Sequence, residues 1–287
     1  MRLPLVLLAA LIAISLLGQA TLIEQGRAAI GRGESDDAIG VLERAVTQTP
    51  KSAEAHFYLA TAYATAAQKR GMFGAAGFVS KIKAEYEKAI ALNPKYVEAR
   101  FALVEFYVFV PGIMGGSYPR AFAQAAEIKA MDPIVGHRAF AFIYAQQKKL
   151  DLAKKEYADA LREEPGSPKA HSDFGQYLAN VEKNYAAAFN ELETALKLDS
   201  NYMPAFYHLG RTASLANSNL ARGEEALKQY IAYKPKENEP TLASAHYTLG
   251  STFEKQGRRE EAKQGYQEAL RLNPSLKQAA EALKRVS

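Results

Sequence analysis

The chain contains no cysteine among its 287 residues. This absence excludes disulfides, zinc–thiolate sites, a cysteine nucleophile and a lipidated N-terminal cysteine. A dense basic block is also missing, because the 36 lysines and arginines and the 31 acidic residues leave a net charge of +5 that is spread evenly along the chain. The isolated pairs Lys148-Lys149 and Arg258-Arg259 do not make the basic stripe that nucleic acid requires, so we expect no nucleic-acid partner.

A long apolar run, residues 3–17, follows a positive charge at Arg2. This is the length and position of the hydrophobic region of a secretory signal peptide, and small residues near its end predict cleavage after Ala20. Because residues 3–23 carry no charge, an uncleaved membrane anchor is the alternative interpretation. Under either interpretation of residues 1–20 the rest of the protein lies outside the cytoplasm, in the periplasm or secreted. Only an uncleaved N-terminus would attach it to a membrane.

Residues 243–276 combine small, aromatic and proline residues in a fixed order, which reads His246-x2-Leu249-Gly250-x2-Phe253, then Gly257, Ala262-x3-Tyr266-x2-Ala269 and Pro274. The segment resembles a tetratricopeptide repeat, a motif of about 34 residues that forms two antiparallel helices. The resemblance implies a turn at Gly257 between the helices. One such unit cannot bury its apolar face alone and needs further copies stacked against it.

The same order of residues recurs upstream, with prolines that close earlier helix pairs at Pro50, Pro94, Pro133, Pro165 and Pro235. We therefore predict an all-α fold, a right-handed α-solenoid of about seven tetratricopeptide repeat (TPR) helix pairs over residues 21–274. Residues 275–287 read as an amphipathic helix that caps the stack. Two insertions interrupt the pattern, near residues 65–80 and 110–117. The first either lengthens a helix or forms a bulging loop.

Four of the five histidines occupy one repeat position, namely His56, His137, His171 and His246. Packed helices lie about 8–10 Å apart, whereas zinc ligands lie about 2.0–2.1 Å from the metal. Histidines from adjacent repeats are therefore too far apart to share a metal, and we expect imidazoles packed within each helix pair. We predict no metal site and no cofactor. His208 is expected to be a surface side chain.

No combination of residues predicts catalysis. His171-Ser172-Asp173 has the composition of a triad, but consecutive residues of a helix point in different directions and cannot converge. Neither inserted segment brings a general acid, a base and a nucleophile together. We therefore expect that the protein is not an enzyme.

The inner face of the predicted solenoid holds the candidate binding residues. In TPR proteins this groove is lined by the first helix of each pair, at positions one, five and eight residues after the position of His246. At the first two of these positions stand mainly aromatic and charged or amide side chains: Phe57, Phe101, Glu105, Arg138, Phe142, Gln176, Tyr207, Arg211 and Tyr247. An apolar groove with a few polar groups suits an extended peptide or a helix. The alternative is that these rings pack against the first helix of the neighbouring repeat.

The insertion near residues 110–117 is a second candidate site, a docking loop made of Pro111, Gly112, Met114, Gly115 and Gly116. Pro-Gly and Gly-Gly pairs are strong turn formers. The segment lacks the glycine and lysine spacing of a nucleotide-binding loop. It is therefore either a simple turn between helices or an exposed loop that docks a partner.

Together these features predict a non-catalytic protein–protein interaction scaffold of the bacterial cell envelope, which binds a peptide or helix of a protein partner along its concave groove. The Pro-Gly-x-x-Gly-Gly segment resembles that of a group of envelope TPR proteins. The alternative is a small-ligand-binding accessory protein of a transport system, because the chain is similar to the helical TPR component found beside certain TRAP-type transporters. An open aromatic groove favours the scaffold, and a closed apolar cavity favours the small ligand. The sequence assigns no oligomeric state.

Overall fold

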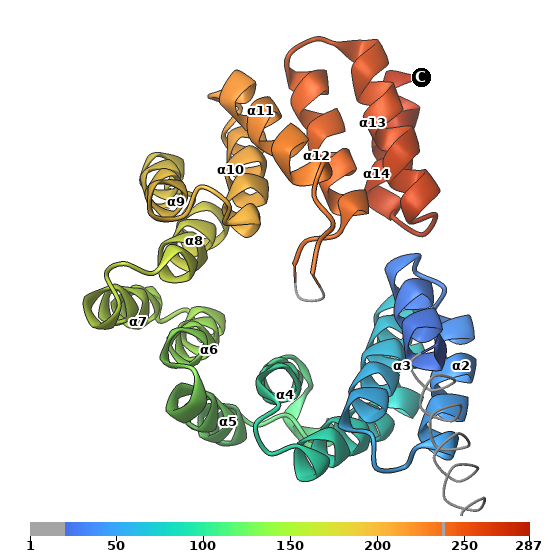
Figure 1. Ribbon diagram of the computed structural model, residues 1–287. Coiled ribbons are helices and arrows are strands. Elements are labelled where there is room, and N and C mark those ends of the chain that lie inside the picture. Colours follow the sequence, from blue (N-terminus) through green and yellow to red (C-terminus); the bar gives the residue numbers. More distant parts are fainter. Residues whose placement is uncertain (1–20, 237–238) are drawn as a thin grey trace, which may run out of the picture. The chain divides into compact units, whose positions relative to one another are not determined.

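The computed structural model describes residues 21–236 and 239–287, except for the side chains at positions 72 and 73. The expected signal peptide or anchor, residues 1–20, lies outside the described residues. All regular secondary structure in the described part is helical (Figure 1), which confirms the all-α prediction. No helix of this part is both long enough and apolar enough to cross a bilayer. The chain divides into two compact units, Met1–Met131 and Asp132–Ser287.

The first unit contains the helical residues 21–31 and then α2 (Ser35–Gln48), α3 (Ala53–Leu92), α4 (Val97–Phe109), the 3-10 turn η1 (Gly112–Met114) and α5 (Tyr118–Met131). Within α3 the backbone leaves the helical region at Gly71, where φ is +68°. A positive φ is easily reached by glycine, which has no Cβ. Both helices of the second repeat therefore lie in α3, and the first insertion lengthens these helices instead of forming a bulging loop.

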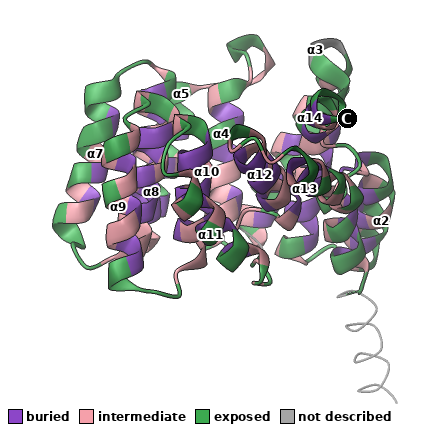
Figure 2. Cartoon of the chain, turned by 90° about the horizontal axis from the view of Figure 1, so that it is seen from above, coloured by how far each residue is buried: buried purple, intermediate pink, exposed green. Residues whose placement is uncertain are grey.

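The second unit contains α6 (Pro133–Gln146), α7 (Leu150–Glu163), α8 (Pro168–Tyr177), the π-helical turn η2 (Leu178–Glu182), α9 (Tyr185–Leu198), α10 (Met203–Ala216), α11 (Leu220–Ile231), α12 (Leu242–Lys255), α13 (Arg259–Leu272) and α14 (Lys277–Val286). Successive helices pair and the pairs stack in tandem, as a solenoid requires. The last helix, α14, packs against α13 and α12. Buried residues lie on the sides of the helices that face one another (Figure 2).

Several helices begin where the sequence supplies a cap. Ser52, Asp132 and Ser167 each precede a helix and accept a hydrogen bond from the backbone N–H three residues later, at 3.1, 2.9 and 3.3 Å. Such caps satisfy N–H groups that have no partner within the helix. Pro133 and Pro168 occupy the first position of their helices, where the missing N–H costs nothing. Local sequence therefore fixes these helix boundaries.

Small residues let the two helices of a pair approach closely. At Gly250 an added Cβ would lie 2.8 Å from Cδ1 of Tyr266 and 3.0 Å from the carbonyl oxygen of Ala262. Tyr266 is fully buried, and its hydroxyl donates to Oε2 of Glu254 at 2.5 Å. Because packed interiors leave little free volume, a larger residue at position 250 would force these groups apart.

The repeated histidines join the two helices of a pair. Nδ1 of His171 lies 2.7 Å from Oε2 of Glu191, and its Nε2 lies 3.2 Å from the carbonyl oxygen of Pro165. His56 and His137 likewise face a glutamate on the second helix of their pair. These two rings are buried, as expected, and the other two of the set are half-buried.

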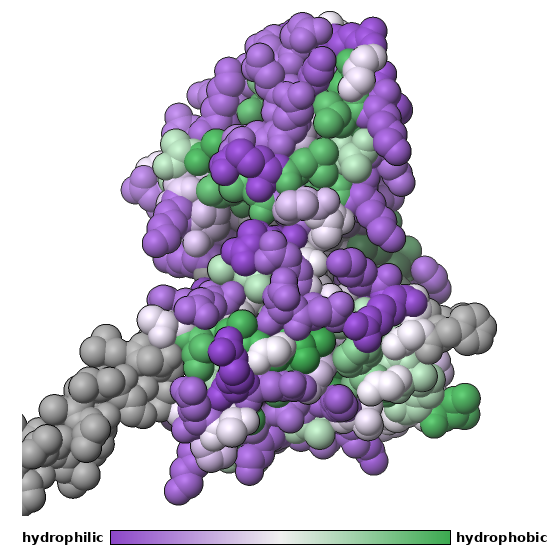
Figure 3. All heavy atoms as spheres, turned by 90° about the vertical axis from the view of Figure 1, so that its right-hand side faces the viewer, coloured by the Kyte–Doolittle hydropathy of each residue, from purple (hydrophilic) through white to green (hydrophobic). Residues whose placement is uncertain are grey.

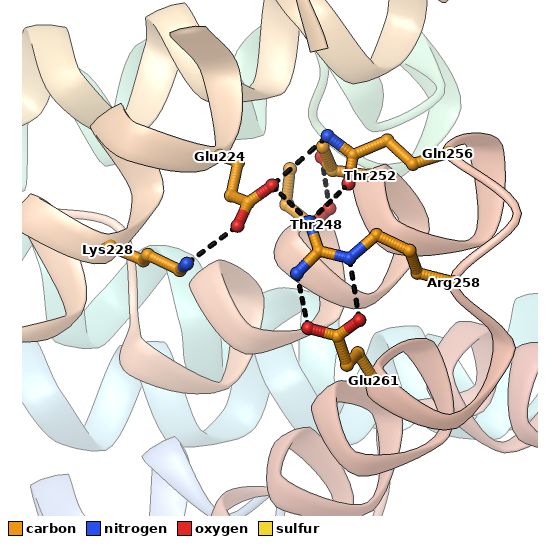
Figure 4. Close-up of polar contacts among 7 residues, drawn as sticks. All are labelled: Glu224, Lys228, Thr248, Thr252, Gln256, Arg258 and Glu261. Atoms are coloured by element: carbon orange, nitrogen blue, oxygen red, sulfur yellow. Dashed lines mark hydrogen bonds and ion pairs between the residues drawn. The ribbon is translucent and has the colours of Figure 1, made fainter. Parts of the chain in front are cut away.

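A polar network links the last two repeats (Figure 4). Glu224 of α11 accepts hydrogen bonds from Nζ of Lys228 at 2.6 Å, from Nε2 of Gln256 at 3.1 Å and from Nη1 of Arg258 at 2.6 Å. Nε of Arg258 also donates to Glu261 at 2.6 Å. The acid of one repeat thus receives donors from the turn of the next, and charge-assisted bonds of this kind are among the stronger ones.

Candidate ligand-binding groove

The first helices of successive pairs in the second unit, α6, α8, α10 and α12, pack side by side in chain order (Figure 1). Polar side chains bridge their junctions. Between α6 and α8, Nη1 of Arg138 lies 3.4 Å from Oδ1 of Asp173. Between α8 and α10, Nε2 of Gln176 lies 3.2 Å from Nε2 of His208. The row of inner helices therefore carries a continuous polar strip among its aromatic residues.

A cleft of about 340 Å³ lies between α10, α12 and the start of α14. Its lining combines two tyrosines, two cations, several hydroxyl groups and two apolar side chains: Tyr207, Arg211, Ser214, Leu215, Ser244, Tyr247, Thr248, Ser251, Lys255, Leu276 and Gln278. At its base the hydroxyl of Ser214 donates to the hydroxyl of Ser251 at 3.0 Å. The volume is at the lower end of the range of about 300–1,000 Å³ that is typical of ligand pockets.

The cleft is positively charged. Its lining includes Arg211 and Lys255 but no carboxylate. Arg211 donates to the side-chain oxygen of Asn180, and Lys255 donates to the backbone oxygen of Ser214. Within residues 21–236 and 239–287 neither cation forms a salt bridge, whereas Arg222 and Arg258 each bind two glutamates. These hydrogen-bond partners of the two cations are therefore neutral, which favours an anionic group in the cleft.

The structure corrects the expectation that His208 is a surface side chain. Its ring is half-buried on the inner row of helices, against the amide of Gln176. Burial, followed by the positive charges of Arg211 and Arg138, lowers the pKa of His208 to about 3. The imidazole is therefore neutral at neutral pH. The positive charge of the groove comes from Arg138, Arg211 and Lys255.

Three of the predicted groove residues lie in the first unit. Phe57 is buried, with its ring centroid 5.0 Å from that of Tyr96 and 5.8 Å from that of Tyr86. These two ring contacts are thus with the second helix of its own pair and with the residue that precedes α4. Phe101 is half-buried and Glu105 is exposed.

The other predicted groove residues lie in the second unit. Tyr207, Arg211 and Tyr247 line the cleft together. Tyr207 is only 9% exposed, with its ring centroid 5.5 Å from that of Tyr230, so it forms a wall and not a free contact surface. Three further groove residues are half-buried on α6 and α8, outside the cleft lining: Arg138, Phe142 and Gln176.

Sequence reasoning missed Asp173, Asn180 and Lys255. Asp173 and Asn180 stand two and nine residues after His171, and Lys255 stands nine residues after His246. Each of the three therefore lies one place beyond an expected groove position, which is one or eight residues after the histidine. On a helix a neighbouring place lies about a quarter-turn away, on the side that faces the adjacent repeat. A count that included these two positions would have found all three residues.

The predicted docking loop forms a tight turn that is closed by backbone hydrogen bonds. Gly116 N–H donates to the Pro111 oxygen at 3.1 Å, and Ser117 N–H donates to the Tyr107 oxygen at 2.8 Å. A Cβ at Gly116 would lie 1.7 Å from the Val110 oxygen, so only glycine fits there. Pro111 and Gly112 are exposed, whereas Met114 and Gly115 are half-buried. The fully exposed residue of the loop is Ile113, which the sequence did not single out.

Over the described ranges, no three histidine, aspartate or glutamate side chains gather as metal ligands. The site therefore consists of hydrogen-bonding groups, two cations and aromatic surface. Such groups can bind and orient a ligand.

Two segments of the chain, residues 23–69 and 243–276, match family models of the tetratricopeptide repeat. No curated protein matches the sequence.

Among solved structures, a TPR protein from Parabacteroides merdae is 16% identical at a TM-score of 0.50, with 93% of this chain and 98% of that chain covered. The human IFIT1 dimer with m7Gppp-AAAA is 19% identical at a TM-score of 0.55, over 93% of this chain and 63% of that chain. The Cut9–Hcn1 hetero-tetramer of APC/C is 15% identical at a TM-score of 0.51, over 90% of this chain and 47% of that chain. The chain thus spans about half of the Cut9–Hcn1 chain, and at these identities the likeness concerns the fold.

Proposed function

Because this chain is a tetratricopeptide repeat protein, we propose that it is a non-catalytic protein–protein interaction scaffold. Its second unit holds a peptide or a helix of the partner on the inner row of first helices. The observation that carries this proposal is the cleft between α10, α12 and α14, in which Tyr207, Arg211 and Tyr247 meet. A fold alone does not define a function, so the proposal rests on this site.

The lining of the cleft fits a short acidic segment. Tyr247 is half-buried and offers part of its ring for apolar contact. Arg211 and Lys255 have no carboxylate of their own within the described residues, so a carboxylate of the partner completes them. Hydroxyl groups such as those of Ser244 and Thr248 supply further hydrogen bonds. An acidic partner segment therefore matches both the shape and the charge.

The proposed place of work is the bacterial cell envelope. It is supported by the apolar run at residues 3–17 after Arg2, which has the pattern of an export signal. The Cut9–Hcn1 assembly shows that a protein with a similar fold works within a multi-protein complex. We extend that class of work, though not its partners, to this chain.

The proposal is tested by a crosslinking pull-down from the envelope fraction. The double variant Arg211→Gln with Lys255→Gln should lose the partner, because the cleft then carries no positive charge. The matched control is Lys197→Gln with Lys234→Gln, which removes two exposed lysines outside the cleft lining. Circular dichroism checks that both double variants keep their helicity.

The aromatic part of the site is tested with Tyr247→Ala, because Tyr207 is too deeply packed for a clean substitution. Its control is Leu198→Ala, at an exposed position of α9 outside the cleft lining. Loss of capture in the cleft variants alone supports the proposal. Undiminished capture by folded cleft variants shows that the partner binds elsewhere.

The size of the cleft, about 340 Å³, also suits a small carboxylate. This second proposal is an accessory protein of a transport system that binds such a ligand. Free carboxylate metabolites should then raise the melting temperature of the wild type by mass action. The same metabolites should leave Arg211→Gln with Lys255→Gln unchanged. A flat response of the wild type over the panel leaves the scaffold as the better proposal.

A further inference from the structure

Both insertions of the chain end at the same edge of the first unit. The hydroxyl of Tyr63 donates to Oε1 of Glu43 at 2.7 Å, and the hydroxyl of Tyr107, one repeat later, donates to Oε1 of Glu87 at 3.3 Å. Equivalent contacts show that the second and third repeats stack in the same manner. Their first helices therefore run in the same direction, and the turns that follow both helices lie at one edge.

This edge is poor in acidic residues. Residues 55–84 contain four basic residues and no aspartate or glutamate. Residues 106–126, which include the docking loop, contain one charge, the cation Arg120. The rest of the chain mixes 31 basic with 31 acidic residues, so two neighbouring segments without a carboxylate stand out. The turn within α3 around Gly71, which belongs to this edge, is largely exposed.

Three exposed cations of this edge keep their charge available. Lys69, Lys81 and Arg120 are exposed and form no salt bridge within the described residues. Lys81 lies 5.2 Å from the ring centroid of Tyr63 and Arg120 lies 5.9 Å from that of Tyr107, so both cations contact a ring and not a carboxylate.

The other charges of the edge are largely matched. Arg70 pairs with Asp36 at 2.5 Å, and Arg32 pairs with Glu34 at 2.6 Å in the neighbouring turn. Lys83 and Glu87, 3.5 Å apart, form a further pair. Asp37 is the remaining exposed acid of that turn. Three unmatched cations against one acid leave the edge positive.

The same edge presents large apolar side chains. Ile113 is 99% exposed and Phe109 is 63% exposed, and Tyr118 lies at the limit of exposure with 37%. Figure 3 shows one face of the molecule, on which hydrophobic residues lie in patches among hydrophilic ones. The hydrogen bonds of the loop hold the backbone on both sides of Ile113 before any contact is made, so docking need not order the backbone of the loop.

We propose that this edge of the first unit binds the surface of an anionic lipid bilayer. Ile113 and Phe109 enter the interfacial region, and Lys69, Lys81 and Arg120 contact the headgroups. The three cations lie on long side chains at the same edge as the exposed Ile113, an arrangement that suits headgroup contact beside an inserted apolar residue. Stable attachment to a membrane takes two such signals together, an apolar group and a basic patch. This contact is separate from membrane attachment through residues 1–20, which is expected only if that segment remains uncleaved.

Co-sedimentation with vesicles tests the proposal. Exported protein is mixed with vesicles of phosphatidylcholine alone or of phosphatidylcholine with phosphatidylglycerol, and intact mass confirms that all variants share one N-terminus. The wild type should bind the vesicles that contain phosphatidylglycerol. Ile113→Ser should weaken this binding about tenfold or more, because burial of one large apolar side chain is lost. Its control is Leu198→Ser, at a position that is 45% exposed in the second unit.

A second pair of variants tests the charge. Lys69→Gln and Lys81→Gln should each weaken binding about fivefold, and the effect should diminish at high salt. Lys197→Gln, an exposed lysine of the second unit, serves as the control. The proposal is overturned if the wild type ignores anionic vesicles, or if Ile113→Ser binds them as Leu198→Ser does. It is equally wrong if Ile113→Ser loses a protein partner while vesicle binding stays unchanged, since the edge then docks a protein.

Discussion

Replacement of Gly210 by alanine tests the stacking of the helices directly. A Cβ at this position would lie 2.3 Å from Cγ of Leu227 and 2.8 Å from the backbone oxygen of Gly223. Carbon atoms in ordinary contact lie about 3.5–4.0 Å apart. Leu227 is fully buried and the second contact is backbone, so neither group can move aside without a shift of α11 against α10.

The expected magnitude follows from two opposed effects. Overpacking of this kind costs about 1–3 kcal/mol. Alanine in place of glycine inside a helix contributes about 1 kcal/mol of stabilisation. Gly210→Ala should therefore lower the free energy of unfolding by up to about 2 kcal/mol. Gly40 supplies the control, because it is exposed within α2 and an added Cβ meets nothing within 4 Å. Gly40→Ala should raise stability by about 1 kcal/mol.

Thermal unfolding followed by circular dichroism measures both variants. In a unit of this size about 1 kcal/mol corresponds to a change of about 2–4 °C in melting temperature. The two variants should move apart, with Gly40→Ala above the wild type and Gly210→Ala at or below it. If Gly210→Ala raises the melting temperature as much as Gly40→Ala does, α10 and α11 are not in close contact and the assigned repeat phase is wrong.

Two further predictions concern protonation. Burial alone would raise the pKa of Glu224, but hydrogen bonds from Lys228, Gln256 and Arg258 lower it below 4.5 overall. The stability that Glu224 contributes is therefore complete above pH 4.5 and is lost as the pH falls through the lowered pKa, so Glu224→Gln should flatten the acid limb of a stability–pH curve. His208, with a pKa lowered to about 3, should show no NMR titration between its ordinary value of 6.5 and pH 4, and an imidazole that titrates near 6.5 would mean that its ring is solvated. Since the unfolded chain binds that proton near pH 6.5 and the folded chain does not, His208 should also reduce stability as the pH falls below 6.5.

The sequence predicted those parts of the fold that have a local cause. Gly250 marks a close approach of helices, and Gly257 marks the turn between α12 and α13, because in each case the reason lies within one repeat. The polar contacts between repeats were harder to predict. Asp173 and His208 were missed as groove residues because their roles depend on how far one repeat rotates against the next, which the periodicity of a single repeat does not specify. Ile113 was missed because turn-forming residues locate a loop without specifying which side chain of the loop points outward.

The junctions before α4 and before α14 differ in the residue that precedes the helix. Tyr96 stands directly before α4, and its ring lies 5.0 Å from that of Phe57 in the preceding repeat, which it helps to bury. Leu276 stands in the equivalent place before α14, where it lines the cleft beside the half-buried Tyr247. A smaller residue at the last junction therefore leaves open the space that an aromatic ring fills at an earlier one.

This comparison predicts the effect of Leu276→Tyr. The new ring should pack on Tyr247 as Tyr96 packs on Phe57, so the cleft should close while stability stays the same or rises, since aromatic pairs contribute about 0.5–1.5 kcal/mol beyond their buried area. Capture of the partner should fall in the crosslinking pull-down, without any change to Arg211 or Lys255. Leu276→Met, which keeps the volume and flexibility of an aliphatic side chain, should retain capture. Normal capture by a folded Leu276→Tyr protein would mean that the ligand does not occupy this cleft, even if the charges beside it matter.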